Sequence, residues 1–194
     1  MLKQHKIYDI SLPISESLAV WPGDQPVKVT QSSHLARGDR NTVSTLAFGA
    51  HTGTHVDAPA HFIFNGSGVD TIDLNVLMGP AFVVETLDVE LLTATALESL
   101  SIPQYCDRVL FHTRNSRLWE EGYSNFNDEY VAISEDGARW LVSSGFRLVG
   151  TDSLSVAPFG NGTPTHHTLL SAGIVVVEGL DLRGIKQGGY QFVC

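Results

Sequence analysis

Four side chains of the kind that bind divalent metals lie close together in the first third of the chain. The segment reads His51-Thr-Gly-Thr-His55-Val-Asp57-Ala-Pro-Ala-His61. Imidazole nitrogens and carboxylate oxygens are the ligands that Zn²⁺, Mn²⁺ or Fe²⁺ takes from a protein. A single histidine on a loop is usually a surface group. Three histidines and an aspartate at this spacing, in a chain with only 8 histidines, indicate a metal site.

The local sequence favours an extended geometry for this segment. Gly53 and Pro59 both disfavour a regular helix. In an extended chain, the side chains of His55 and Asp57 point to the same side, and Gly53 lets the chain turn His51 toward them. A helical geometry would also place His51 and His55 on one face, so either conformation can bring the ligands to one ion.

Three apolar runs each end in a residue capable of chemistry, namely His112, Asp152 and Glu178. In open α/β sheets, ligands bind outside the carboxyl ends of the strands. Glu178 is the most informative, because a carboxylate that follows four apolar residues needs a cation or strong donors, an ion pair with Lys or Arg being the alternative. Asp152 equally suits the capping of a turn, and His112 is expected to be structural.

A pair of histidines, His166-His167, opens the helix predicted just before the strand that leads to Glu178. A neutral imidazole is favoured at a helix N-terminus, and the neutral form is the one that binds metals. Adjacent helical residues point about 100° apart, so only one of the two reaches a given ion. The physics of the sequence does not choose between them.

The elements that must position these residues change character along the chain. Strands are expected at 6–12, 27–30 and 43–48, the last two half-buried. Further on, strands at 80–87, 108–112, 146–150 and 174–177 alternate with helices that Thr95, Ser134 and Thr165 cap and that end before Pro103, Gly145 and Gly173. This alternation predicts an α/β fold with a mixed central sheet, in a single domain over residues 1–194.

Composition and charge exclude several classes of function. The chain has a net charge of −9 and no cluster of basic residues, which excludes nucleic acid as the main partner. No apolar run approaches the roughly 20 residues of a membrane helix, and the N-terminus lacks a secretory apolar region. Two cysteines, Cys106 and Cys194, form no disulfide framework, so a cytoplasmic location without membrane contact is expected. No P-loop, dinucleotide fingerprint or nucleophile elbow is present.

The segment HTGTHVDAPAHF resembles the signature of the metal-dependent cyclase-like hydrolases, the family that includes bacterial kynurenine formamidase and isatin hydrolase. Trp21-Pro-Gly-Asp24, the segment 148–153 and the segment from His166-His167 to Glu178-Gly-Leu also resemble this family. The order and spacing of these motifs match along nearly the whole chain. The resemblance implies a swivelling β/β/α fold and a homodimer or homotetramer.

The resemblance also implies roles for particular residues. It implies one or two divalent metals per chain, with zinc the first expectation and manganese the second. The first metal would be held by His51, His55 and Asp57, with Asp57 bridging to a second metal on His166 and Glu178. The family spacing favours His166 over His167. His61 would be the acid/base residue, and Trp21 would form part of the aromatic wall against which a flat small-molecule substrate lies.

One departure from the family concerns the C-terminal end. The family usually continues with a further core strand, whereas this chain ends at Gly-Gly-Tyr-Gln-Phe-Val-Cys194. A shortened chain is therefore expected. None of the implied ligands is missing.

The chemistry of such a site, taken with the resemblance, predicts hydrolysis of a small amide or lactam, and the resemblance implies an N-formyl aryl amide such as N-formylkynurenine as the leading candidate. The metal would lower the pKa of a bound water and polarise the carbonyl, and His61 would protonate the leaving amine. Trp21, Phe48 and Phe62 are available to line an apolar slot, although packing is the expected role of the two phenylalanines. Isatin-type lactam opening and polyketide cyclisation remain alternatives on the same site. A metal- or ligand-binding module without catalysis is the alternative of another class, and His61 argues against it.

Overall fold

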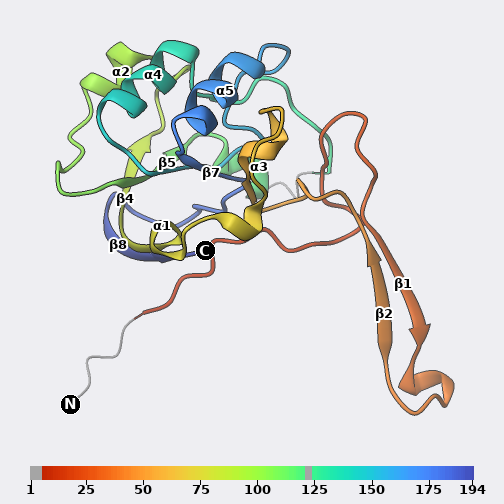
Figure 1. The fold of residues 1–194 in the computed structure, drawn as a ribbon. Coiled ribbons are helices and arrows are strands. Elements are labelled where there is room, and N and C mark those ends of the chain that lie inside the picture. Colours follow the sequence, from red (N-terminus) through yellow and green to blue (C-terminus); the bar gives the residue numbers. More distant parts are fainter. Residues whose placement is uncertain (1–5, 121–123) are drawn as a thin grey trace.

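A six-stranded sheet forms the centre of the computed structural model, which describes residues 6–120 and 124–194 (Figure 1). The strand order is β3-β7-β6-β5-β4-β8. The bounds are β3 His55–Asp57, β4 Met78–Thr86, β5 Arg108–Thr113, β6 Leu148–Thr151, β7 Val175–Glu178 and β8 Gly188–Val193. Strands β4 to β7 are parallel, and β3 and β8 pair antiparallel at the two edges. The mixed α/β fold predicted from the sequence is therefore confirmed.

Helices cover one face of this sheet, as the upper part of Figure 1 shows. They are α2 Ala94–Glu98, α4 Glu135–Ser143 and α5 Thr163–Ser171. Val149 of β6 and Val176 of β7 form one hydrophobic cluster with Leu141 of α4 and Leu169 of α5. The continuous apolar runs of the parallel strands follow from burial on both faces.

The other face of the sheet is covered by the segment that follows β7. Leu180, Leu182 and Ile185 pack there against Val175 and Val177. Residues of β7 thus alternate between the two faces, which places Glu178 on the helix side together with Val176. The shorter helices are α1 Leu74–Leu77 and α3 Ser116–Glu120, and 3-10 turns lie at Leu35–Arg37, Pro59–His61 and Val69–Thr71.

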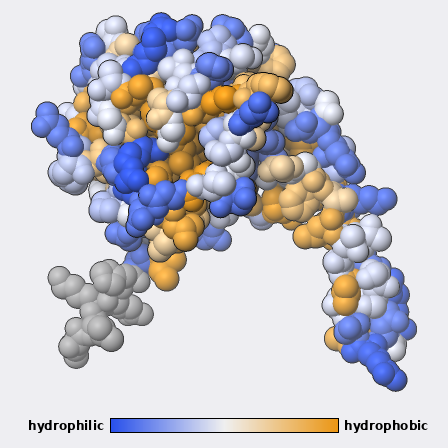
Figure 2. Space-filling model, viewed as in Figure 1, coloured by the Kyte–Doolittle hydropathy of each residue, from blue (hydrophilic) through white to orange (hydrophobic). Residues whose placement is uncertain are grey.

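A two-stranded hairpin projects from the body of the molecule (Figures 1 and 2). It consists of β1 Lys28–Ser33 and β2 Val43–Ala47. Val29 and Leu46 are cross-strand partners and remain 40% and 56% exposed. The prediction of strands was right here, but the prediction of half-burial was wrong, because the hairpin stands apart from the core.

Helix starts were only partly predictable. Ser134 caps α4 by accepting from the Gly137 N–H at 3.2 Å, and Gly145 follows the helix with φ 80°, both as predicted. Thr93, not Thr95, caps α2, since its hydroxyl accepts from the Ala96 N–H at 3.2 Å. The cap predicted at Thr165 is also wrong: α5 begins at Thr163, and the Thr165 hydroxyl donates to the Ile133 carbonyl at 3.1 Å.

The strand predicted at 6–12 forms only an isolated bridge between Ser11 and Leu180 within the described part of that range. The other described residues of this segment pair with no neighbouring strand, so the prediction of a strand here was wrong. Among the described residues, no helix is both long and apolar enough to cross a membrane.

Candidate metal centre

The pairing of β3 with β7 brings the predicted ligands together. His55 lies directly opposite Glu178, and Asp57 lies opposite Val176. Because side chains alternate along a strand, His55, Asp57 and Glu178 all point to the helix side of the sheet. Helix α5 packs on that side, and His166 lies in its first turn. The ligands therefore converge at the carboxyl end of β7, where α/β sheets bind ligands.

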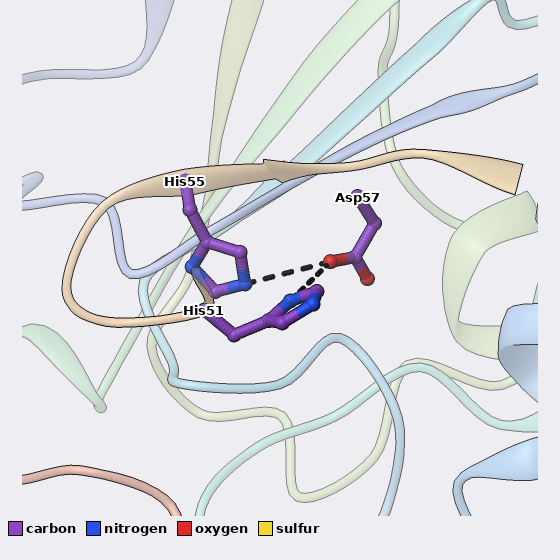
Figure 3. Close-up of side chains that lie close together, drawn as sticks. All are labelled: His51, His55 and Asp57. Carbon is purple, nitrogen blue, oxygen red and sulfur yellow. Dashed lines mark ion pairs between the residues drawn. The ribbon is translucent and has the colours of Figure 1, made fainter. Parts of the chain in front are cut away.

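A turn before β3 brings His51 back toward the strand, as the extended geometry predicts (Figure 3). Gly53 has φ 66°, a conformation that favours glycine. Its carbonyl lies 2.9 Å from His55 Nδ1, which leaves Nε2 of that ring for the site. Gly179, also at positive φ (67°), packs so closely on this turn that a Cβ there would lie 2.3 Å from the Gly53 oxygen. The turn and the end of β7 thus hold each other in place.

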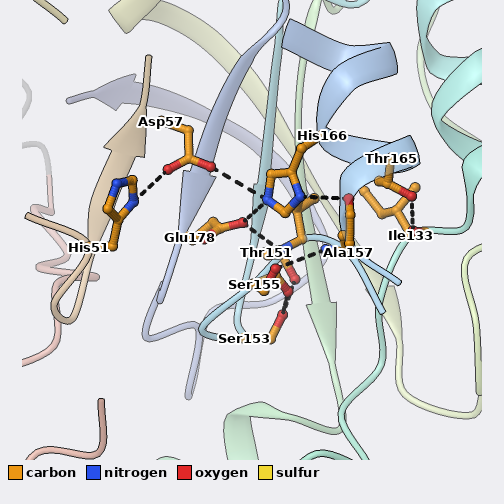
Figure 4. Close-up of polar contacts among 12 residues, drawn as sticks. His51, Asp57, Ile133, Thr151, Ser153, Ser155, Ala157, Thr165, His166 and Glu178 are labelled. Carbon is orange, nitrogen blue, oxygen red and sulfur yellow. Dashed lines mark hydrogen bonds and ion pairs between the residues drawn. The ribbon is translucent and has the colours of Figure 1, made fainter. Parts of the chain in front are cut away.

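Two sets of ligand atoms share Asp57. In the first set, Asp57 Oδ1 lies 2.9 Å from His51 Nδ1 and 3.5 Å from His55 Nε2 (Figure 3). In the second, His166 Nε2 lies 3.6 Å from Asp57 Oδ2 and 3.1 Å from Glu178 Oε1 (Figure 4). Within each set the ligand atoms lie within 4.8 Å of one another. Each set is therefore compact enough to surround one ion.

The ligand atoms fit a metal better than they fit one another. Among the described residues, four buried atoms at the centre of the cluster have no hydrogen-bond partner: His51 Nδ1, His55 Nε2 and both carboxylate oxygens of Asp57. They approach each other closely but lack the alignment of hydrogen bonds. Buried polar atoms normally have partners, and nitrogen and carboxylate oxygen are ligands that zinc accepts. Divalent ions held by the two ligand sets would satisfy all four.

The buried carboxylates of the cluster also favour a positive charge beside them. Burial opposes protonation of His55, yet the carboxylates of Asp57 and Glu178 raise its pKa to about 10. Burial acts to raise the pKa of Asp57, but the surrounding histidines hold it below its usual range. Two buried carboxylates in contact with histidines favour a bound cation, whether protons or a metal ion.

Groups outside the two ligand sets orient the ligands. The Val156 N–H donates to Glu178 Oε1 at 2.6 Å, and the Gly162 carbonyl lies 2.9 Å from His166 Nδ1. Such partners fix the direction of a metal-binding side chain. Sequence reasoning missed both, because main-chain donors and acceptors carry no residue-type signal.

His61 lies beside the ligand sets without belonging to either. It ends the 3-10 turn Pro59–His61, and its ring stacks on that of His51 with centroids 3.9 Å apart. The ring is exposed to the cavity mouth, and partial burial lowers its pKa, which favours the neutral imidazole. The structure thus places a solvent-accessible imidazole next to a candidate ligand.

A cavity of about 400 Å³ opens above the cluster. Its lining includes Trp21, His61, Phe62 and the edge of the cluster at His166 and Glu178. The Phe62 ring stacks on His166 with centroids 4.2 Å apart. Phe62 also packs against the hydrophobic core on the helix side of the sheet, so it has both the expected packing role and a place in the cavity lining.

Trp21, which the resemblance places in an aromatic wall, lines the cavity. Its ring packs against Phe126 and Phe159, with centroids 5.0 and 5.5 Å away. Phe48 is 41% exposed and does not line the cavity. Both roles considered for it, packing in the core and lining the apolar slot, were therefore wrong.

The remaining residues considered from the sequence lie outside the ligand sets. His112 Nδ1 lies 3.0 Å from the Ile185 carbonyl, in agreement with a structural role. The Asp152 carboxylate accepts hydrogen bonds from the backbone and hydroxyl groups of Thr113 and Ser116, and burial raises its pKa to about 6. His167 faces outward and lies 3.3 Å from the Ser171 hydroxyl. Of the two adjacent histidines, only His166 reaches the cluster.

Comparisons with known proteins identify the family of this chain. The family model described as "Putative cyclase" matches residues 8–158. Cyclase-like protein 3 of Oryza sativa subsp. japonica is 38% identical over 200 residues, covering 97% of this chain and 73% of the relative. Kynurenine formamidase of Salinibacter ruber is 36% identical over 193 residues, covering 96% of this chain and 88% of the relative.

A solved structure described as a potential metal-dependent hydrolase with cyclase activity superimposes with a TM-score of 0.82 at 34% identity. The superposition covers 97% of this chain and 88% of that one. The chain therefore belongs to the cyclase family of metal-dependent hydrolases. It is a hydrolytic enzyme with a candidate site for a divalent metal.

Proposed function

We propose that the enzyme hydrolyses the amide bond of a small aryl formamide, with N-formylkynurenine as the leading substrate. The observation that carries the proposal is the pair of ligand sets at the base of a cavity walled by Trp21 and Phe62. Relatives that are kynurenine formamidases, at 36% and 32% identity, support the choice of substrate. The products would be formate and an aryl amine.

The proposed metal ligands are His51, His55 and Asp57 for one ion and Asp57, His166 and Glu178 for a second. A bound divalent metal supplies a Lewis acid for the carbonyl and a water of lowered pKa at neutral pH. Zinc is the first candidate, since two histidines and a carboxylate are ligands it accepts, and manganese is the second.

The chain's own residues then position the substrate and move the proton. Trp21 and Phe62 would hold the aryl ring flat and exclude water from the reacting carbonyl. The neutral imidazole of His61 would take a proton from the attacking water and return it to the leaving nitrogen. Protonation of that nitrogen allows the carbon–nitrogen bond to break and an amine to leave.

We propose a cytoplasmic homodimer or homotetramer, on the basis of the family resemblance and the cysteine content. The exposed hairpin β1–β2 offers surface that an assembly of subunits would cover, because a free two-stranded hairpin is only marginally stable.

Replacing His61 with alanine tests the acid/base role. We expect His61→Ala to lower kcat for N-formylkynurenine by about 10²- to 10⁴-fold, the usual contribution of a positioned acid/base group. Metal content should not change, because His61 belongs to neither ligand set. The measurements are steady-state kinetics and elemental analysis on the same preparation.

The matched control is His167→Ala, which removes an outward-facing histidine next to a ligand. It should keep both metal and turnover. Normal turnover in His61→Ala would refute the acid/base role, whereas lost turnover with retained metal would refute the non-catalytic binding module. Measuring hydrolysis of an isatin-type lactam in the same assays distinguishes lactam opening from formamide hydrolysis at this site.

A further inference from the structure

One β-turn carries two residues of the cavity wall. In the segment Trp21-Pro22-Gly23-Asp24, the Asp24 N–H donates to the Trp21 carbonyl at 3.0 Å, and Gly23 has φ 96°. Proline at the second position and positive φ at the third are the features of a type II turn. The turn fixes the backbone of Trp21 relative to that of Asp24, and both residues line the cavity.

The Asp24 carboxylate lies at the rim next to the turn that bears His51. A Cβ built on Gly49 would be 4.0 Å from Asp24 Oδ2 and 3.7 Å from the Thr52 hydroxyl, so the carboxylate lies over the turn from Gly49 to Thr52. The residue is exposed. Within the described ranges 6–120 and 124–194, its carboxylate has no ion pair and no hydrogen bond. It is therefore free to bind a ligand.

The charges of the cavity wall favour a cation at this rim. None of the described residues that line the cavity is Lys or Arg. The carboxylates among them are Asp24 at the rim and Glu178 at the base, and Glu178 is already engaged by His55 and His166. An aryl ring beside Trp21 would place a short side chain near Asp24. An ammonium on that chain would be attracted and could also approach the Trp21 ring, whereas an anion would be repelled.

We propose that Asp24 is a specificity-determining residue that binds an ammonium group of the substrate. The proposal rests on the proposed aryl formamide hydrolysis and refines its substrate class to aryl formamides whose side chain bears an ammonium group. N-formylkynurenine carries an ammonium together with a carboxylate, and the ammonium is the group that Asp24 would bind. Because one turn carries both residues, Trp21 and Asp24 would contact the same substrate molecule.

The test compares two substrates that differ only in charge. One is an ortho-formamidophenyl ketone whose ethyl chain ends in a primary ammonium, too short to close onto the ketone, and the other is the same ketone with a methyl group in place of the ammonium. Asp24→Asn keeps the size of the side chain and removes its charge. The matched control, Asp88→Asn, removes the same charge from an exposed position that does not line the cavity.

We expect Asp24→Asn to lower kcat/KM for the ammonium substrate by about 5-fold, the scale of a solvent-accessible ion pair. The methyl substrate should be unaffected, as should both substrates with Asp88→Asn. Added salt should reduce the wild-type preference for the ammonium substrate, because the pair is screened. Equal loss on both substrates, or no loss on either, would overturn the proposal.

Binding of the two aryl amine products, measured by calorimetry on the metal-loaded protein, separates this proposal from the proposed function. If no formamide is hydrolysed but Asp24→Asn weakens only the ammonium product, the reaction is misassigned and the cation site stands. If formamides are hydrolysed and both products bind Asp24→Asn as tightly as wild type, the reaction stands and the cation site is refuted.

Discussion

Asp57→Ala is expected to remove the bound metal and to lower turnover of the formamide by at least about 10³-fold. Asp57 is the one residue shared by the two ligand sets, through Oδ1 in the first and Oδ2 in the second. Metal catalysis is worth several kcal/mol of transition-state stabilisation, and each 1.4 kcal/mol is a factor of ten in rate. Metal stoichiometry by elemental analysis and kcat on the same sample measure both effects.

Asp88→Ala controls for the loss of one negative charge, because this aspartate is exposed and outside the cavity. It should retain metal and activity. Circular dichroism of Asp57→Ala establishes that the variant is folded, which separates loss of the site from loss of the protein. A folded Asp57→Ala protein with full metal content would contradict the shared-ligand arrangement.

Gly179→Ala should lower the free energy of unfolding and should also disturb the metal site. The residue has φ 67°, and a Cβ would lie 2.3 Å from the Gly53 oxygen and 2.8 Å from the Gly53 carbon. Those atoms are backbone, so the turn carrying His51 and His55 would have to move. We expect a loss of about 3 kcal/mol or more in the free energy of unfolding, from left-handed strain together with the clash.

Gly173→Ala is the matched control for this prediction. Gly173 has φ 75°, but nothing lies within 4 Å of a Cβ there. The substitution therefore tests the backbone strain alone and should cost about 1 to 2 kcal/mol. Urea denaturation of both variants, with metal titration of each, measures the difference. Equal stability and equal metal affinity in the two variants would show that the contact between Gly179 and Gly53 does not hold the site.

The sequence predicted the parts of the site that follow from local geometry. The two-residue alternation of a strand predicts that His55 and Asp57 point the same way, and a glycine at position 53 permits the turn that returns His51. Glu178 could be singled out because an unpaired carboxylate after four apolar residues needs partners. The structure supplies them as His55, His166 and the Val156 N–H.

Other features depend on strand register and long-range packing, which a single sequence does not show. The pairing of His55 with Glu178 fixes the site, yet these residues are far apart in the chain. The exposure of the β1–β2 hairpin could not be predicted either, because its alternation of residues is the same whether or not one face is covered. The physics of the sequence did not choose between His166 and His167, because the choice depends on which face of α5 packs on β7, and only the family spacing favoured His166.

Metal content and metal-dependent turnover on one preparation test the central claim most directly. The protein would be purified without chelator and analysed for metals, then assayed with N-formylkynurenine before stripping, after stripping, and after addition of Zn²⁺ or Mn²⁺. We expect one or two divalent ions per chain, loss of turnover on stripping and its recovery on addition. A preparation without metal that hydrolyses no formamide after either metal is added would contradict the account.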